Sequence, residues 1–145
     1  MPVDPQDQVR DGYLLLTTAA RMVQRRYDDA LAPLGLTRAA VIALGAMSRR
    51  PMNQEQLAAM VHVQSQTLGR VLTRLEAAGL VSRERDEHDR RQFQVEITDA
   101  GEAALRAARE AENAALPSDF VGWEALREQL SRLVTSFQSP RQTRG

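Results

Sequence analysis

The charged stretch at residues 83–90 is the first feature of this sequence that could do chemistry, because seven of its eight residues carry a charge at neutral pH. It ends in Arg90, Arg91 follows directly, and Asp86 and Asp89 stand just before them. A guanidinium group can enter the narrow, strongly negative minor groove of DNA, and an adjacent carboxylate can hold it in the inserted conformation. The alternative is a solvated turn, so the neighbouring segments must decide between the two.

The residues that flank this stretch predict a β-hairpin with the charges at its tip. Phe93, Val95 and Ile97 stand at alternate positions, which is typical of a strand with one buried face, and we expect them to anchor the hairpin to the core. Residues 80–85, which include the first three charges, predict the antiparallel partner strand, and residues 86–89 predict the loop. The charges would then lie at a fixed distance from the core.

Two short helices before the hairpin predict a helix-turn-helix. Asn53 and Gln56 have the spacing of a capping box, which starts a helix that ends near His62. After a tight turn, an apolar stripe predicts a second helix over residues 65–78, and Gly79 ends it. Two short helices joined by such a turn form a helix-turn-helix, and the added hairpin makes it a winged helix.

The second of these helices has a polar outer face opposite its apolar stripe. In a major groove, the first turns of such a helix meet base edges, where Gln, Ser and Thr exchange hydrogen bonds and Arg binds guanine or phosphate. Many helical hairpins have polar exposed faces, so the pattern is informative only together with the hairpin that follows. The candidate DNA-binding residues here are Gln64, Ser65, Gln66, Thr67, Arg70 and Arg74.

Longer helices are predicted on both sides of this lobe. Apolar residues at helical spacing predict one helix from Val9 to Leu31. Pro33 and Gly35 then break the chain before a helix that begins at a Thr37 cap and runs through Met47.

Two further helices are predicted after the hairpin, over residues 99–117 and 118–137. The last is so apolar that it needs a partner, either a second copy of the chain or another part of the same chain. We therefore expect one mainly α domain over residues 1–138 with a small β-hairpin wing. Within it, a winged helix-turn-helix lobe covers about 37–98, and dimerisation helices cover about 7–32 and 99–138. Residues 139–145 have the composition of a disordered tail.

Composition excludes several classes of site. The chain has 145 residues and no Cys, which rules out disulfides, thiolate metal sites and thiol redox sensing. With two His residues and no Cys, the composition does not favour a metal site, and no cofactor is expected. The formal net charge is zero, yet residues 31–95 hold nine Arg against six acids. Every basic residue is Arg, whose planar fork suits phosphates and guanine edges.

The segment QLAAMVHVQSQTLGRVLTRLEAAGLVSRERDEHDRRQFQVEITDAG resembles the MarR family of bacterial transcriptional regulators. The family hallmark is an Asp-x-x-Asp-Arg-Arg wing followed by a strand and a Thr-x-x-Gly helix start. The residues that match it here are Asp86, Asp89, Arg90, Arg91, Thr98 and Gly101.

The resemblance implies a homodimeric winged-helix repressor or activator that reads a pseudo-palindromic operator in double-stranded DNA. It places Ser65, Gln66, Thr67 and Arg70 in the major groove and Arg91 at the minor groove. Arg74 and Arg90 would bind phosphate or brace, and we expect Asp89 to orient Arg91. The chain departs from the family pattern at three positions, which puts the target sequence in doubt: His62, Gln64 and Gly69. Gly69 either permits close approach to the DNA backbone or is tolerated drift.

Members of the family commonly bind small aromatic or anionic molecules between the dimerisation helices and the DNA-binding lobe. By that resemblance the candidate inducer-binding residues are Tyr13, Arg21, Met47 and Trp123. No spacing in the sequence singles these four residues out.

Other functions fit the sequence less well. An enzyme would need a nucleophile with its base, a metal cluster or a phosphate loop, and none of these patterns is present, so we expect no catalysis. A winged helix that binds only proteins is the stronger alternative, and it would have no affinity for DNA. The sequence has neither a signal-peptide pattern nor a long apolar run, so the expected location is cytoplasmic, away from membranes.

Overall fold

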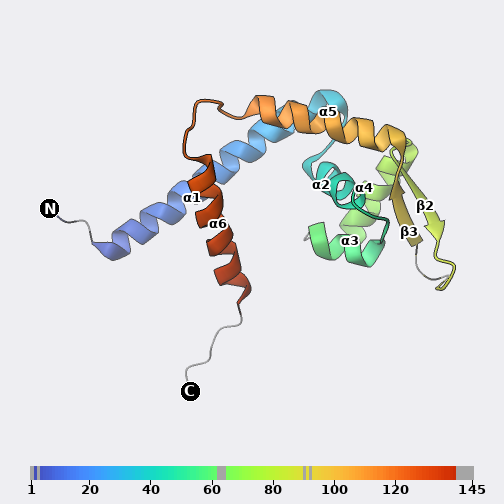
Figure 1. Cartoon of the computed structure of the whole chain (residues 1–145), viewed down its shortest axis with the longest axis horizontal. Helices are drawn as coiled ribbons and strands as arrows, with labels where there is room; N and C mark the ends of the chain where they lie inside the picture. Colours follow the sequence, from blue (N-terminus) through green and yellow to red (C-terminus); the bar gives the residue numbers. More distant parts are fainter. Residues whose placement is uncertain (1, 3, 62–64, 90, 92, 140–145) are drawn as a thin grey trace, which may run out of the picture.

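The structure is a computed structural model that describes residues 2, 4–61, 65–89, 91 and 93–139. Helices α1 and α5 pack along one another as an extended arm, and a lobe of shorter helices and strands lies at one end of α5 (Figure 1). In chain order the elements are α1 (Pro5–Leu31), the 3₁₀ helix η1 (Ala32–Leu34), α2 (Arg38–Met47), β1 (Met52–Asn53), α3 (Gln54–Val61), α4 (Ser65–Ala77), β2 (Val81–Arg85), β3 (Phe93–Ile97), α5 (Asp99–Ala115) and α6 (Trp123–Gln138).

The first break and the start of α2 lie where the sequence predicts them. The chain leaves α1 through the short helix η1 and then turns at Gly35, whose φ of 68° belongs to the left-handed region that favours glycine. Thr37 caps α2, because its side-chain oxygen accepts a hydrogen bond of 3.2 Å from the backbone N–H of Ala40. The predicted end of this helix at Met47 is confirmed.

The predicted capping box of α3 is confirmed atom by atom. The backbone N–H of Gln56 donates to Oδ1 of Asn53 over 2.8 Å, and the backbone N–H of Asn53 donates to Oε1 of Gln56 over 3.3 Å. The helix then continues to Val61. The tight turn predicted after it, with His62 and Gln64, lies outside the described residues.

Helix α4 ends in a Schellman motif at Gly79, as predicted. Gly79 has a φ of 76°, its N–H donates to the carbonyl of Glu76 over 2.9 Å, and the N–H of Leu80 donates to the carbonyl of Leu75 over 2.9 Å. Strand β2 begins at Val81, directly after this motif. The helix and the wing are therefore joined by a very short connection.

The sheet has three strands in the order β1-β3-β2, one more than the predicted hairpin. Strand β1 pairs with β3 in antiparallel fashion, with Met52 opposite Val95, and both residues are buried. A strand of two residues is too short to show any periodicity, so it could not be recognised in the sequence. It ties the start of α3 to the base of the wing.

The expected inward position of Phe93 is wrong. Val95 is buried and Ile97 packs against the core, but Phe93 is 37% exposed and pairs with Arg85 near the tip of the hairpin. The guanidinium carbon of Arg85 lies 5.5 Å from the centroid of the Phe93 ring, in a cation–π arrangement. Alternation gives the face of a strand on which a residue lies, but not how far the core extends beneath that face.

The hydrophobic core lies in the lobe. Leu31 is the one buried residue of α1, and α6 contributes none. The largest fully buried side chains are Leu31, Leu44, Leu57, Leu68, Leu72, Leu105 and Val95. Most of α1 and all of α6 therefore stand outside the core of this chain.

The last two helices differ slightly from the expectation. Helix α5 starts at a Thr98 cap, as predicted, but α6 begins only at Trp123 and not at residue 118. Phe120 precedes the helix and packs edge-to-face on Trp123, with ring centroids 4.9 Å apart. Within the described ranges, no single helix has both the length and the apolar character to cross a bilayer; one pair, Pro5–Leu34 with Arg38–Met47, reaches that level only when combined and is bent by 79°.

Candidate nucleic-acid interface

Helix α4 separates its polar residues from its apolar ones as the sequence predicts. Leu68, Leu72 and Leu75 are buried against the lobe, which is why the helix cannot rotate without exposing them. The opposite face carries exposed polar side chains, among them Gln66, Thr67, Arg70, Thr73 and Arg74. Ser65 begins the helix, and Gln64 lies outside the described residues.

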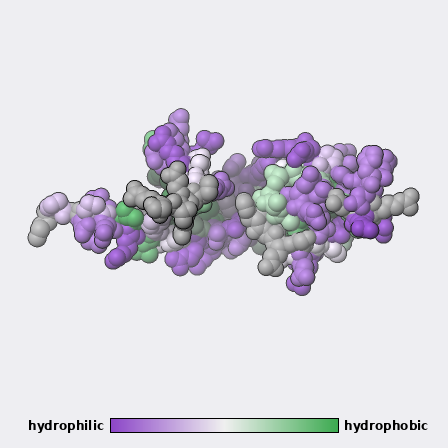
Figure 2. Space-filling model, turned by 90° about the horizontal axis from the view of Figure 1, so that it is seen from below, coloured by the Kyte–Doolittle hydropathy of each residue, from purple (hydrophilic) through white to green (hydrophobic). Residues whose placement is uncertain are grey.

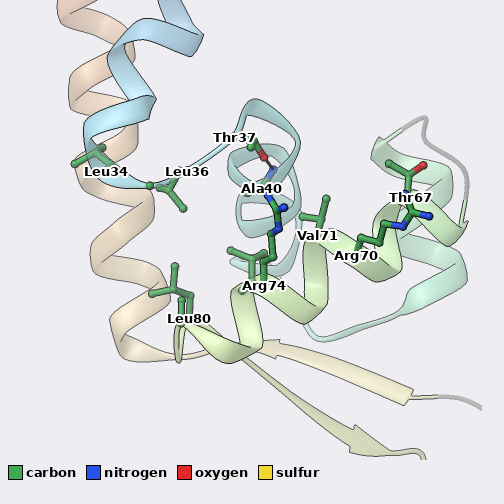
Figure 3. Close-up of a pocket in the computed structure, with 12 residues that line it drawn as sticks. Leu34, Leu36, Thr37, Ala40, Thr67, Arg70, Val71, Arg74 and Leu80 are labelled. Atoms are coloured by element: carbon green, nitrogen blue, oxygen red, sulfur yellow. Dashed lines mark hydrogen bonds between the residues drawn. The ribbon is translucent and has the colours of Figure 1, made fainter.

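One edge of this face borders a groove of about 330 Å³ between α4 and the start of α2. Figure 3 shows Thr67, Arg70 and Arg74 projecting from α4, with Thr37 and Ala40 of α2 across the groove. Leucine and valine side chains form the rest of the wall, including Leu36, Val71 and Leu80. The two arginines therefore line an apolar groove, and both residues are exposed.

The wing tip is shaped by two carboxylates that bind the main chain. Oδ1 of Asp86 accepts the backbone N–H of His88 over 2.9 Å, and Oδ1 of Asp89 accepts the backbone N–H of Arg91 over 3.1 Å. The hydrogen bond from His88 is the main reason why the pKa of Asp86 lies below its usual value. Asp89 therefore contacts the backbone of Arg91, whereas the sequence suggested a contact with the guanidinium group. Arg90 lies outside the described residues.

Three of the predicted cationic contacts are available to a ligand. Among the described residues, no carboxylate forms an ion pair with the side chain of Arg70, Arg74 or Arg91; the two ion pairs found there are Arg83 with Glu76 and Arg132 with Glu128. All three free arginines are exposed. Unpaired guanidinium groups on a helix face and at a wing tip suit phosphates and base edges.

Arg83 is a residue of this surface that the sequence analysis missed. It projects from β2 to α4, where Nη2 donates to the carbonyl of Gly69 over 3.2 Å and to Oγ1 of Thr73 over 3.3 Å. Its Nε lies 3.2 Å from Oε2 of Glu76. The position of Arg83 in its strand could have identified it. Side chains alternate between the two faces of β2, so Arg83 lies on the same inward face as Val81, where a charged side chain is unusual.

Gln54 is the second residue of this surface that the sequence did not identify, and its side chain lies next to Gly69. A Cβ atom on Gly69 would lie 3.3 Å from Nε2 of Gln54, so the side-chain amide of Gln54 lies close to α4 at this residue. With Gln66, Arg70, Thr73, Arg74 and Arg83, these two residues line a groove of about 760 Å³. Apart from Gly69, every residue that lines it has a polar side chain.

The four candidate inducer-binding residues do not form one site. Tyr13 and Trp123 line an apolar groove of about 760 Å³ between α1 and α6, together with Arg38 from α2. Arg21 is exposed on α1, where its Nε donates to the carbonyl of Thr17 over 3.4 Å. Met47 is buried in the lobe core. The sequence did not identify Arg38 because only tertiary structure brings it to this groove.

A group of titratable residues lies where α1, α2 and α5 meet. Burial, and then the negative charge of Glu112, raise the pKa of Tyr27. Burial also raises the pKa of Glu112, against the opposing effect of Arg109 and Arg38. Arg38 therefore contributes to this group as well as to the α1–α6 groove.

Known proteins share both the sequence pattern and the fold. A family model described as MarR family matches residues 34–92. The transcriptional regulator BldR from Sulfolobus solfataricus has a TM-score of 0.82 and 28% identity, over 92% of this chain and 99% of BldR. MarR itself has a TM-score of 0.73 and 31% identity, over 84% of this chain and 93% of MarR.

The transcriptional repressor CouR is similar in two structures. Bound to a 23-mer DNA duplex, it has a TM-score of 0.73 and 29% identity, over 86% of this chain and 89% of CouR. CouR from Rhodococcus jostii RHA1 bound to p-coumaroyl-CoA has a TM-score of 0.76 and 26% identity, over 90% of this chain and 93% of CouR. With a winged helix-turn-helix whose exposed face and wing suit DNA, and with these similarities along nearly its whole length, this chain belongs to the MarR family of DNA-binding transcriptional regulators.

Proposed function

We propose that this protein is a homodimeric repressor that binds a pseudo-palindromic operator and releases it when a small molecule binds. The observation that carries the proposal is the pairing of an exposed polar face on α4 with a wing tip that carries a free arginine. A helix of this kind fits a major groove, and an arginine on a hairpin reaches the adjacent minor groove. CouR, which is described as a transcriptional repressor, is similar to this chain and has been seen on DNA.

In this proposal each candidate DNA-binding residue has a defined role. Gln66, Thr67 and Arg70, with Gln64 and Ser65 before them, read base edges in the major groove. Arg74 and Arg90 bind phosphates, which fixes the position of the protein without reading sequence. Arg91 enters the minor groove, and Asp89 holds its backbone.

Unburied apolar residues on the outer helices support the homodimer. In Figure 2 the green of hydrophobic residues interrupts the hydrophilic surface at the left, over the part of the molecule occupied by α1. A second copy would cover such residues on both helices and would place two copies of α4 about one turn of DNA apart. The exposed apolar residues of the two helices are Val9, Tyr13, Leu14, Leu15 and Met22 on α1 and Trp123, Leu126, Val134 and Phe137 on α6.

The proposed inducer is an aromatic or anionic molecule. CouR has been observed with p-coumaroyl-CoA, which contains both kinds of group. In this chain the groove with Tyr13, Trp123 and Arg38 offers two aromatic rings and one cation, a combination that suits such a ligand. Arg38 begins α2 and Thr37 caps it, so a ligand here would contact the lobe as well as the arm.

The test is a selection of DNA fragments from a random-sequence pool, followed by gel shifts at two salt concentrations. A sequence-specific regulator enriches a two-fold symmetric fragment, and its affinity falls as salt rises. Arg70→Ala should weaken binding of that fragment about 10- to 100-fold and lower its preference over a shuffled fragment, because base contacts of this kind contribute about 1–3 kcal/mol of discrimination. Equal losses on both fragments would make Arg70 a phosphate contact. A winged helix that binds only proteins would enrich no fragment at either salt concentration.

A further inference from the structure

We infer that Arg83 is a positioning residue that holds the wing at a fixed angle to α4 and thereby places Arg91 on DNA. This inference rests on the proposed function, because it concerns how two DNA-contacting parts are held together. Its basis is a set of three contacts from one side chain of β2 to the DNA-binding section of α4.

Arg83 is unusual because most of its charged side chain is buried. Arg83 lies opposite Val95 in the register of β2 and β3, and Val95 is fully buried. The side chain of Arg83 keeps 21% of its surface exposed, and its Nε is itself buried. A charge in such a place is costly unless hydrogen bonds or an opposite charge compensate for it. An apolar residue would fill this position at lower cost if packing were the sole requirement.

The guanidinium group of Arg83 contacts helix α4. Nη2 of Arg83 donates to the carbonyl of Gly69 and to the hydroxyl of Thr73, which itself donates to the same carbonyl over 2.8 Å. Gly69 lies between Leu68 and Arg70, in the part of α4 whose outer face carries the candidate base contacts. Nε adds the carboxylate of Glu76 at 3.2 Å, an ion pair whose angle does not meet that of a hydrogen bond. One planar guanidinium thus spans two turns of the helix.

The outer part of the wing extends beyond Arg83 toward the tip of the hairpin. Among the described residues between Arg83 and Val95, none is buried, so these residues add no buried side chain to the core. Phe93, which the sequence suggested as an anchor, is exposed and packs on Arg85 within the wing. Arg83 therefore joins the wing to α4 just inside this outer part. Its loss would let the tip swing while the base of the sheet stayed in place.

Lysine could not replace Arg83 in this role. An ammonium group is a compact charge without the planar fork that reaches a carbonyl, a hydroxyl and a carboxylate at once. The substitution Arg83→Lys should therefore give an intermediate loss, whereas Arg83→Met keeps the apolar stem and removes all three polar contacts.

The test is a double-mutant cycle on DNA binding, with the fragment that the wild-type chain enriches from a random-sequence pool as the probe. We expect Arg91→Ala to weaken binding about tenfold in the wild-type background and less than about threefold in Arg83→Met. Arg83→Met alone should weaken binding nearly as much as Arg91→Ala does. Hydroxyl-radical footprints should lose protection at the minor-groove positions under the wing and keep it at the major-groove positions under α4.

Arg132→Met is the matched control, because it removes an Arg–Glu ion pair of the same charge from α6, outside the lobe. It should leave the cycle unchanged. If the two losses in the cycle multiply, or if Arg83→Met binds like the wild type, the positioning role is overturned. Should Arg83→Met fail to fold, the pair Thr73→Val and Glu76→Gln removes partners of the guanidinium from the α4 side and must give the same coupling. If the wild-type chain enriches no fragment, the proposed function falls and the positioning role falls with it.

Discussion

The carbonyl oxygen of Leu80 occupies the space in which a side chain on Gly101 would begin. A Cβ atom built on Gly101 overlaps this oxygen and also crowds Cγ1 of Ile97 at 2.6 Å. The same carbonyl accepts the N–H of Thr98 over 3.1 Å, and the Thr98 hydroxyl donates to the carbonyl of Gly79 over 2.7 Å. The Thr-x-x-Gly start of α5 is thus fitted against the connection between α4 and the wing.

Gly101→Ala should therefore destabilise the protein. The added methyl group meets backbone atoms that cannot move without disturbing the end of α4, so we expect a loss of about 1–3 kcal/mol in the free energy of unfolding. Chemical denaturation monitored by circular dichroism measures this loss. Unchanged stability would mean that α5 can shift away from Leu80 at little cost.

Gly69→Ala should instead stabilise the protein. Alanine favours a helix interior over glycine by about 1 kcal/mol, and among the described residues the close neighbour of the new methyl group is the end of the flexible Gln54 side chain, at 3.3 Å. A small shift of that amide relieves the contact. The midpoint of denaturation should therefore rise, and a fall would show that Gln54 is held rigidly over α4.

Asp89→Ala and Arg91→Ala should both weaken operator binding without changing thermal stability. Asp89 accepts the backbone N–H of Arg91, so its removal loosens the turn that presents the cation. A plain electrostatic patch predicts the reverse for Asp89→Ala, because deleting an acid near phosphates strengthens binding.

The comparison of Asp89→Asn with Asp89→Ala separates these two explanations further, because a plain electrostatic patch predicts the same gain for both variants. The amide oxygen of asparagine can still accept the N–H of Arg91, while the negative charge is gone. Binding by Asp89→Asn should be at least as tight as that of the wild type. Gel shifts of all three variants at one fixed salt concentration decide the matter, and tighter binding by Asp89→Ala would reject the positioning of Arg91 by Asp89.

Glu112→Gln should stabilise the protein at neutral pH. Burial raises the pKa of Glu112 in the folded state, so the folded state binds more protons than the unfolded state between the ordinary and the raised pKa. Stability therefore falls as the pH rises through this window, and it stays lower above it. The gain from Glu112→Gln should shrink as the pH falls through the same window, which thermal unfolding at several pH values measures. A spectrophotometric titration should also show a lower pKa for Tyr27, because the charge of Glu112 contributes to raising it.

Deleting residues 118–145 should convert the protein to a monomer with a folded lobe. The core takes Leu31 from α1 and nothing from α6, so the lobe should keep its packing without the last helix. Analytical ultracentrifugation would report the mass and circular dichroism the helicity. A truncated protein that stays dimeric, or one that loses all helicity, would contradict this expectation.

Local signals in the sequence predicted most element boundaries. The Thr37 cap, the Asn53 and Gln56 box and the Gly79 motif each depend on residues within a few positions of one another, so their chemistry is visible without the fold. Strand β1 has two residues and depends on pairing with a distant strand, so it left no pattern. The depth of Phe93 likewise depends on what packs beneath the sheet.

The candidate DNA-binding surface likewise contains residues that the sequence could predict and residues that it could not. The outer face of α4 follows from helical periodicity, and the structure exposes Gln66, Thr67, Arg70 and Arg74 together. The contacts of Arg83 span fourteen positions in sequence and the approach of Gln54 to Gly69 spans fifteen, so neither could be seen before folding. The four candidate inducer residues were chosen by resemblance, and tertiary structure separates Arg21 and Met47 from the other two.

The short connection at Gly79 and Leu80 should also limit the operators that the proposed regulator can accept. Because a Schellman motif joins the end of α4 directly to β2, the spacing between the proposed major-groove and minor-groove contacts would be set mainly by the protein and not by the DNA. One extra base pair between those contacts rotates them by roughly 34° about the duplex axis, since a turn takes about 10.5 base pairs. Operators should therefore vary in base sequence far more readily than in the spacing of their contacted positions.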